Sequence, residues 1–471
     1  MRRGVALYPL TPTILPVVMH WGQLQPDYRL ASLLAPSGFS VAGHDAGHML
    51  HLPDTGIRVD DRIDSRPEAW DILLAVETAE DNEGICEERL ELVRWALSHE
   101  KHVHYIGRSP DSVPDGLREL AGEYEGQVRI TTLWTKREDL YPKEKLHRFQ
   151  VPLVLVGGLI EEADVFAMLV KLYARLVQDG ERPLVVTKQP IGGLLGFASI
   201  EPALCALSVD EAEKIERINV LLKDLETREQ PSIILLEAPD AVMKYNNYLT
   251  NGFGIRTYML AQAAEPDAFL CCIPSELGEM PFVEEISRDF SLRLGVGIDA
   301  VHVSNAVIDG VDSRQERKLY LTHTTLEDID GRIRQQREAY PEGNCLFNGW
   351  TEDFEGLYHT LFMDAQEEAP PPQDGAAPDP RAWLLELLGS KFGVPEEMLA
   401  KDNWDLPLTG EFFGFSGMDL FYLLLEVEKR TGCSIPVEAL SDYQFNSIST
   451  VLKTLETIPA DIPASQVGDP V

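Results

Sequence analysis

The residues with the clearest chemical potential in this 471-residue chain form an apolar run that ends in glycines and leads into a helix. The run VPLVLVGG spans 151–158, and apolar residues at helical spacing follow from Asp164 to Gln178. A strand, a glycine turn and a helix in this order form the setting of a phosphate-binding loop. In such a loop backbone N–H groups surround phosphates, while a lysine and a Ser/Thr hydroxyl contact phosphate and Mg²⁺.

The side chains that this chemistry needs are replaced. When the pattern GxxxxGK[ST] begins at Gly158, Asp164 takes the place of the lysine and Val165 that of the hydroxyl residue. Two consecutive glutamates at 161–162 add further negative charge, and carboxylates this close should repel a triphosphate. We therefore predict no cofactor here, with Gly157 and Gly158 making a tight strand-to-helix turn; residual nucleotide binding is the alternative.

Three histidines lie close together in the segment GHDAGHMLH, at His44, His48 and His51, with Asp45 among them. Imidazole and carboxylate groups are common metal ligands. His48 and His51 would share a face only in a helix, and the two glycines of the segment oppose one. We favour exposed loop histidines, with a metal site as the alternative.

The segment 381–457 has the pattern of four short helices and resembles acyl carrier proteins, most clearly from its second helix through GCSIP. In that alignment Gly417 takes the place of the serine that carries phosphopantetheine, and Ser416 precedes it. Because glycine has no hydroxyl, we expect Ser416 to be the N-cap of the helix. A carrier protein that uses Ser416 after a one-residue shift is the alternative.

The second helix of this module is apolar on two sides. Leu423 and Val427 belong to the inward stripe expected of a bundle. The outer side carries Met418, Phe421, Tyr422 and Leu425. A solvated face is rarely this apolar, so we predict that it is a contact surface, either for a partner protein or for the chain's own core.

Alternating strands and helices must position these groups. Residues 1–148 contain apolar runs of strand length at Gly4–Tyr8, Asp71–Val76 and His102–Ile106, with helical spacing between the last two. This order predicts a Rossmann-like parallel sheet. No GxGxxG follows the first run, so we expect no dinucleotide site there.

Residues 149–363 predict a second α/β unit, whose further strands we place at 183–188, 232–239, 268–275 and 301–309. Runs this apolar indicate a parallel sheet that is covered on both faces. Together with the altered loop, the pattern predicts a degenerate P-loop NTPase-like domain.

The rest of the chain is a linker and a tail. Residues 364–380 are rich in Pro, Ala and acids and cannot bury a core, and residues 458–471 form a flexible tail. Across the chain, 77 acidic residues face 41 basic ones, a formal charge of −36. This charge disfavours nucleic acid and anionic membranes, and it favours a basic partner or simply solubility.

The cysteines and the apolar runs argue against a disulfide-linked, zinc-binding or membrane-spanning protein. Six cysteines are scattered without a CxxC pair, so neither a disulfide framework nor a closed zinc site is expected. No apolar run approaches the ~18 residues of a membrane-spanning helix. We predict a cytoplasmic protein.

The middle of the chain resembles the P-loop part of the D-glutamate N-acetyltransferase-like family, related to dethiobiotin synthetase folds. The resemblance rests on VPLVLVGG, SIILLEAP and GFGIRTYMLAQAAEPDAFLCCIPSE. It implies that Glu237, at the end of IILLE, occupies the place of an acid that looks catalytic in that family. The missing loop lysine means that the family's chemistry is not carried over.

A closer resemblance is to clostridial-type peptide maturation system proteins, over residues 1 to about 330. It rests on the first strand with YP, the block APSGFSVAGHDAG, the LGF turn and NNYLTNGFG. It implies a non-catalytic accessory or scaffold protein that binds a precursor peptide or a radical-SAM maturase. The alternatives are an ATP-using or acyl-transferring enzyme with Glu237 as acid/base, and a phosphopantetheinylated carrier.

Overall fold

The computed structural model describes residues 3–60, 62–137, 139–141, 146–206, 209–247, 249–316, 318–341, 343–362, 380–392, 394–410, 412–415, 420, 423, 427 and 446–457. The chain divides into two compact units, Met1–Ala369 and Pro370–Val471. This boundary falls inside the predicted linker. Among the described residues no helix is both long enough and apolar enough to cross a bilayer.

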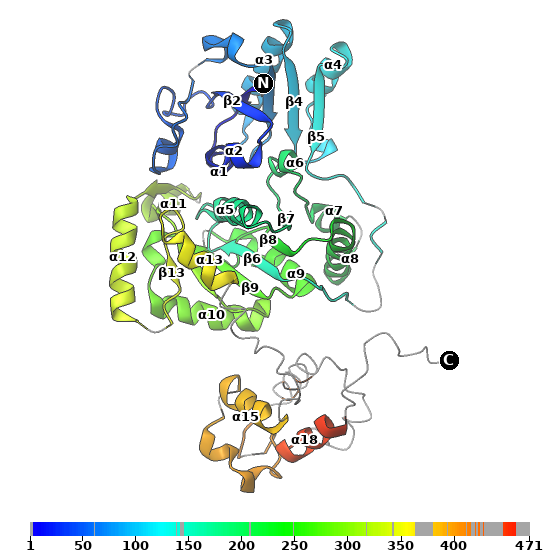
Figure 1. Cartoon of the computed structure of the whole chain (residues 1–471), viewed down its shortest axis with the longest axis vertical. Helices are drawn as coiled ribbons and strands as arrows, with labels where there is room; N and C mark the ends of the chain where they lie inside the picture. Colours follow the sequence, from blue (N-terminus) through cyan, green and yellow to red (C-terminus); the bar gives the residue numbers. More distant parts are fainter. Residues whose placement is uncertain are drawn as a thin grey trace. The chain divides into compact units, whose positions relative to one another are not determined.

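The first unit begins with a five-stranded parallel sheet of order β2-β1-β3-β4-β5 (Figure 1). Its strands are β1 (Arg3–Tyr8), β2 (Tyr28–Leu33), β3 (Ile72–Val76), β4 (His102–Gly107) and β5 (Val128–Thr132). Its helices are α1 (Leu15–Met19), α2 (Trp21–Leu24), α3 (Glu83–Ser98) and α4 (Asp115–Glu123). The predicted parallel sheet is confirmed, and β2 is an edge strand that the apolar pattern did not reveal.

Alternate residues of β1 show how this sheet is covered on both faces. Val5 and Leu7 belong to the apolar cluster that contains α1. Ala6 and Tyr8 belong to the cluster that contains α3. Side chains of a strand point alternately to opposite faces, so each face acquires its own helix layer.

The same unit holds a six-stranded parallel sheet of order β13-β10-β9-β6-β8-β7. Its strands are β6 (Leu153–Gly158), β7 (Pro183–Val186), β8 (Ile233–Glu237), β9 (Ala268–Ile273), β10 (Ala300–Val303) and β13 (Leu346–Phe347). The run predicted as one strand at 301–309 is divided. After β10, the segment β11 (Ala306–Ile308) leaves the sheet and pairs antiparallel with β12 (Leu321–His323).

Helices cover both faces of this second sheet. Apolar residues of α5 (Val165–Gln178) and α13 (Phe354–Phe362) pack on one face. Those of α8 (Glu211–Glu229), α9 (Ile255–Ala264), α10 (Met280–Leu294) and α12 (Leu326–Ala339) pack on the other. The short helices α6 (Gly192–Leu195), α7 (Glu201–Leu204) and α11 (Gly310–Glu316) lie in connections.

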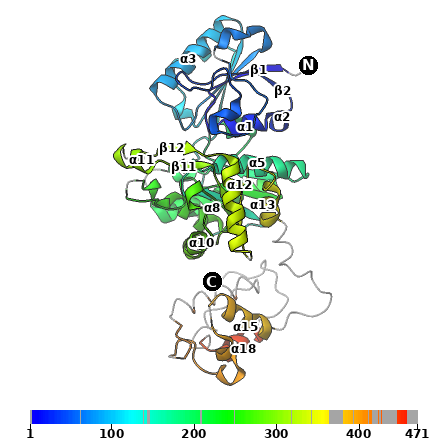
Figure 2. The same cartoon turned by 90° about the vertical axis from the view of Figure 1, so that its left-hand side faces the viewer.

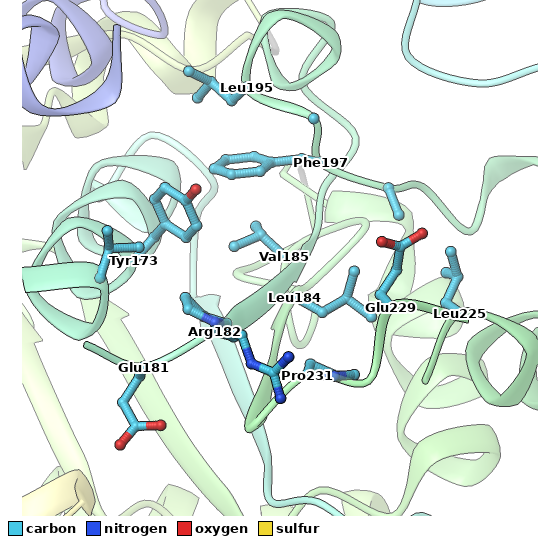
Figure 3. A pocket seen from close by; sticks show the side chains of 14 residues that line it. Tyr173, Glu181, Arg182, Leu184, Val185, Leu195, Phe197, Leu225, Glu229 and Pro231 are labelled. Atoms are coloured by element: carbon cyan, nitrogen blue, oxygen red, sulfur yellow. The ribbon is translucent and has the colours of Figure 1, made fainter. Parts of the chain in front are cut away.

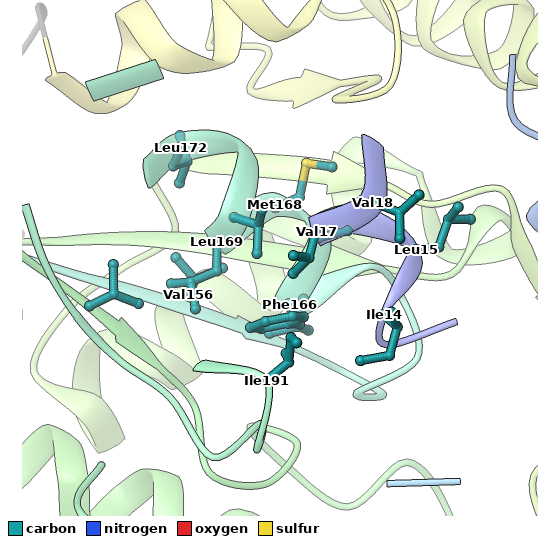
Figure 4. Packing of buried hydrophobic residues seen from close by; sticks show 14 of the residues in the cluster. Ile14, Leu15, Val17, Val18, Val156, Phe166, Met168, Leu169, Leu172 and Ile191 are labelled. Atoms are coloured by element: carbon teal, nitrogen blue, oxygen red, sulfur yellow. The ribbon is translucent and has the colours of Figure 1, made fainter. Parts of the chain in front are cut away.

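Helix α5 is shared between the two sheets. It lies against the second sheet, and α1 of the first sheet lies beside it in both views (Figures 1 and 2). Val17 and Val18 of α1 lie next to Met168 and Leu169 of α5 (Figure 4). This double contact explains why nine of the fourteen residues of α5 are buried and why its sequence is apolar on more than one side.

The second unit has its own apolar core. The described helices are α15 (Pro380–Ser390) and α18 (Ile448–Thr457), with short 3₁₀ turns at Glu396–Leu399 and Lys401–Asn403. Trp383 and Leu387 of α15 pack with Val451 of α18. Leu423 and Val427, predicted to face inward, are buried in this cluster.

Candidate functional site

The two sheets of the first unit bring two switch points together. In the first sheet the chain leaves β1 for β2 on one side and continues through β3 on the other. In the second sheet β6 has the later strands β8 and β9 as its two neighbours. Ligands of open parallel sheets bind beyond the carboxyl ends of the strands, where the strand order reverses. The loops that follow β1, β3, β6 and β7, together with the last residue of β8, all contribute to one cavity.

This cavity has a volume of about 260 Å³. The first half of the unit contributes Pro12, Thr13, Pro16, Leu50, Ala79 and Glu80. The second half contributes Glu161, Glu162, Asp164, Val165, Phe166, Ala167, Gln189, Glu237, Leu321 and His323. Its walls combine five carboxylates with apolar side chains, and no lysine or arginine of the described chain lines it.

Glu237 is the buried carboxylate of this site, with 4% of its surface exposed. It ends β8, and its Oε1 accepts a hydrogen bond from Gln189 Nε2 at 3.0 Å. Its Oε2 accepts hydrogen bonds from Thr187 Oγ1 and from the Lys188 backbone N–H. Burial raises the pKa of Glu237, although Lys188 and these donors oppose the rise. The carboxylate therefore fixes the loop after β7 against the end of β8.

Lys188 places a cation beside one carboxylate of the cavity. Its Nζ donates to the carboxylate of Glu161 and, at 3.1 Å, to the carbonyl oxygen of Pro239. The loop after β6 is thus joined by an ion pair to the loop after β7. The pair partly neutralises Glu161 and leaves Glu162 exposed beside it.

Asp164, at the place of the loop lysine, is bound within a buried network. Its Oδ2 accepts hydrogen bonds from His302 Nε2 and Trp350 Nε1, each at 3.0 Å. Burial alone would raise the pKa of Asp164, but hydrogen bonds and the interaction with His302 outweigh it, and the pKa is lowered. The negative charge is therefore held by internal donors, and its main role is structural.

The two glycines of the loop are required by close packing. A Cβ on Gly157 would lie 2.9 Å from Val242 Cγ1, and one on Gly158 would lie 2.7 Å from the carbonyl oxygen of Ile160. Either atom would be closer than real contacts allow. Val165, at the place of the hydroxyl residue, is the first residue of α5 and is buried.

Glu80 is a site residue that the sequence patterns did not indicate. Its Oε1 accepts hydrogen bonds from the backbone N–H of Thr13 at 3.2 Å and from Thr13 Oγ1 at 2.7 Å. Its Oε2 is buried and has no hydrogen-bond partner among the described residues. A buried acceptor without a donor is costly unless a ligand or water supplies one. The only sequence signal was its position, four residues after the end of β3.

The three candidate histidines do not converge. His48 Nε2 lies 3.2 Å from Asp54 Oδ1, and the rings of His44 and His48 are 5.7 Å apart. His51 stacks on His323 with ring centroids 6.1 Å apart, and burial lowers the pKa of His323. In the described chain, no three side chains of His, Cys, Asp or Glu are grouped as metal ligands.

The candidate residues of the C-terminal module lie outside the described residues. These are Ser416, Met418, Phe421, Tyr422 and Leu425. Their predicted roles, as an N-cap or carrier attachment point and as a contact surface, remain predictions.

Comparisons with known proteins do not assign a function to the chain. No family model matches the chain, and no curated protein matches it. Among solved structures, it is similar to a DUF1611 family protein from Anabaena variabilis, with 11% identity and a TM-score of 0.42. The match covers 67% of this chain and 91% of that protein. A likeness at this level leaves the function to be inferred from the site itself.

Proposed function

We propose that the first unit binds a basic segment of a peptide, with a lysine or arginine side chain in the acid-lined cavity. The observation that carries this proposal is Glu80 Oε2, a buried acceptor without a donor beside a cavity lined by carboxylates. Ammonium and guanidinium groups supply donors and positive charge together. The apolar walls, which include Leu50, Phe166 and Leu321, suit the aliphatic stem of either side chain.

The charges around the cavity support a cationic ligand over a phosphate. Glu80 and Glu162 are not paired with a cation in the described chain, while Glu161 is held by Lys188. Burial lowers the pKa of His323, which disfavours a positive charge on this ring beside a cationic ligand. The formal charge of −36 would add long-range attraction for a basic partner.

We further propose that this binding serves an accessory role in the maturation of a ribosomally made peptide. The substrate segment would belong to the precursor peptide, and a radical-SAM maturase would be the second partner. The second sheet would then be a phosphate-loop fold that has exchanged its ligand, since Asp164 and Val165 stand where the essential side chains would be. The acyl-carrier-like module would contact the maturase through the outer side of its second helix.

The test is the binding of fluorescein-labelled octalysine to the full-length chain, measured by fluorescence polarisation at low and high salt. Glu80→Gln should weaken binding about tenfold, since hydrogen bonds to charged groups are worth ~1.5–3 kcal/mol. Glu119→Gln, on the exposed side of α4, is the matched control and should bind as the unaltered chain does. Equal losses in both variants, or equal binding of octaglutamate, would overturn the proposal.

A precursor peptide encoded beside the chain would extend the test to the biological partner. Binding of that peptide to the full chain should show the same dependence on Glu80. If the Glu80→Gln variant binds the precursor peptide as well as the unaltered chain does, the peptide does not bind in this cavity.

An enzymatic alternative rests on Glu237. A buried carboxylate with a raised pKa at the end of a central strand is the environment of many general acids and bases. Its hydrogen bonds to Thr187, Gln189 and Lys188 also explain it as a structural group. If the chain binds a labelled nucleotide and the Glu237→Gln variant does not, the result would favour the enzyme.

A further inference from the structure

The outer edge of β7 is only partly paired with another strand. β7 is the last strand of the second sheet, and the carbonyl of Arg182, just before it, accepts the N–H of Ser232 next to β8. Since backbone groups alternate along a strand, those of Pro183, Val185 and Thr187 point away from β8. Ala198 meets this edge at one place: its N–H donates to the carbonyl of Val185, and its carbonyl accepts the N–H of Thr187, each at 2.9 Å.

The chain turns away just before it could cover the rest of the edge. Gly196 has φ +75°, a left-handed conformation that glycine adopts without strain. This turn leaves the carbonyl of Pro183 and the N–H of Val185 without a neighbouring strand in the described part of the chain. These two groups lie on either side of Leu184. In the same way, the carbonyl of Val185 and the N–H of Thr187, which pair with Ala198, lie on either side of Val186. One residue of a parallel strand could therefore pair opposite Leu184.

A cavity of about 300 Å³ lies along this open edge (Figure 3). On one face of the strand Leu184 packs with Leu225 of α8. On the other face Tyr173 and Phe197 pack edge to face, with ring centroids 4.8 Å apart. Figure 3 shows these side chains around the opening. The side chains on each face of an added strand would thus contact an apolar surface of the protein.

Charged residues surround the opening. Glu181, Arg182 and Glu229 line it, so acids outnumber bases there. Glu181 and Glu229 are exposed. A bound segment with a basic residue beside its apolar residues would match this rim.

We propose that the edge of β7 binds an extended, net-basic segment of a partner polypeptide by parallel strand addition opposite Leu184. Such a segment would present two consecutive large apolar residues, one toward Leu225 and one toward Tyr173 and Phe197, flanked by lysine or arginine. Strand addition draws affinity from main-chain hydrogen bonds and specificity from alternate side chains. This site is separate from the acid-lined cavity, and neither depends on the other.

The experiment measures binding of a capped, labelled peptide, Lys-Lys-Val-Phe-Lys-Gly, to the full-length chain. Each peptide bond is N-methylated in turn. The residue opposite Leu184 must donate its N–H to the carbonyl of Pro183, while its neighbours point outward. Methylation at that residue should weaken binding about tenfold or more, and methylation at the residues on either side of it should not. Loss at no position, or equal loss at all positions, overturns strand addition, as does the absence of saturable binding.

Protein variants locate the site. Glu229→Lys should weaken the same peptide several-fold, whereas Glu119→Lys, an equal change of charge on α4, should leave it unchanged. The amide of Val185 should exchange more slowly with deuterium when the peptide is bound. Glu80→Gln should not change the binding of this peptide. The experiment therefore tests the β7 edge independently of the proposal that the acid-lined cavity binds a basic side chain. Equal effects of Glu229→Lys and Glu119→Lys would overturn the location.

Discussion

The imidazole Nε2 of His302 lies 3.0 Å from Oδ2 of Asp164, although 138 residues separate them in the sequence. His302 Nδ1 accepts the backbone N–H of Gly349 at 3.0 Å, so the ring hydrogen is on Nε2 and is donated to Asp164. Asp164 is thus the acceptor of a network that ties the start of α5 to β10. The charge of Asp164 is therefore used to hold the structure at this point of the chain.

Asp164→Asn should lower the free energy of unfolding at pH 7 by about 1.5–3 kcal/mol, because two side-chain donors lose a charged acceptor. The pKa of Asp164 is lowered in the folded chain. Its charge thus stabilises the fold above the unfolded pKa of about 3.9, and that contribution is lost as the pH falls through the folded pKa. Urea unfolding followed by tryptophan fluorescence should show a full difference at pH 7 and a smaller one in acid.

The control for this variant is Asp115→Asn, whose side chain is 98% exposed. It should change stability by no more than about 0.5 kcal/mol. If Asp164→Asn is as stable as the unaltered chain at pH 7, the network does not hold the loop.

Leu169→Ala should destabilise both sheets together. Leu169 is fully buried in α5, which packs against the second sheet and against α1 of the first. A cavity of this kind costs about 2–5 kcal/mol. Hydrogen exchange should show that amides of β1 and β6 lose protection in one step. Retained protection in β1 alone would mean that the two halves fold independently.

Mg²⁺–ATP should not bind to the chain. Asp164 and Val165 replace the lysine and hydroxyl that such binding needs, and Glu161 and Glu162 border the same cavity. Isothermal calorimetry should record only heats of dilution. Micromolar binding that requires Mg²⁺ would contradict this prediction.

Incubation with coenzyme A and a broad-specificity phosphopantetheinyl transferase should leave the intact mass of the chain unchanged. Gly417 has no hydroxyl, and we expect Ser416 to act as an N-cap. A mass gain that disappears in Ser416→Ala would instead identify a carrier protein.

Limited proteolysis should first cut within residues 364–380, because their Pro-, Ala- and acid-rich composition predicts an exposed linker and exposed linkers are cut first. The boundary between the two compact units, after Ala369, lies in this range. Mass spectrometry should find a C-terminal fragment that starts near Arg381 and remains folded. A first cut elsewhere would show that the linker is misplaced.

The sequence by itself determined the class of the fold and much of the local chemistry. Continuous apolar runs such as VPLVLVGG predict strands buried on both faces, and both parallel sheets confirm this. The sequence also showed that the phosphate-loop pattern lacks its lysine, with Asp164 at that spacing, because the motif depends on spacing within one strand–loop–helix segment. The same local information missed β2 and treated β10 and β11 as one strand, since apolar character does not show where a strand leaves its sheet.

Only the tertiary structure decided which groups meet. Strand order places β8 beside β6, and the loop after β3 of the other sheet borders the same cavity, so Glu80 and Glu237 line it together. Lys188 joins them from a third segment through its backbone N–H, which donates to Glu237. The partner of Asp164 is likewise supplied by β10. The open edge of β7 exists because this strand ends the sheet and Gly196 turns the chain aside. Such relationships depend on the order of the strands and the direction of each side chain, which long-range packing fixes and local spacing does not.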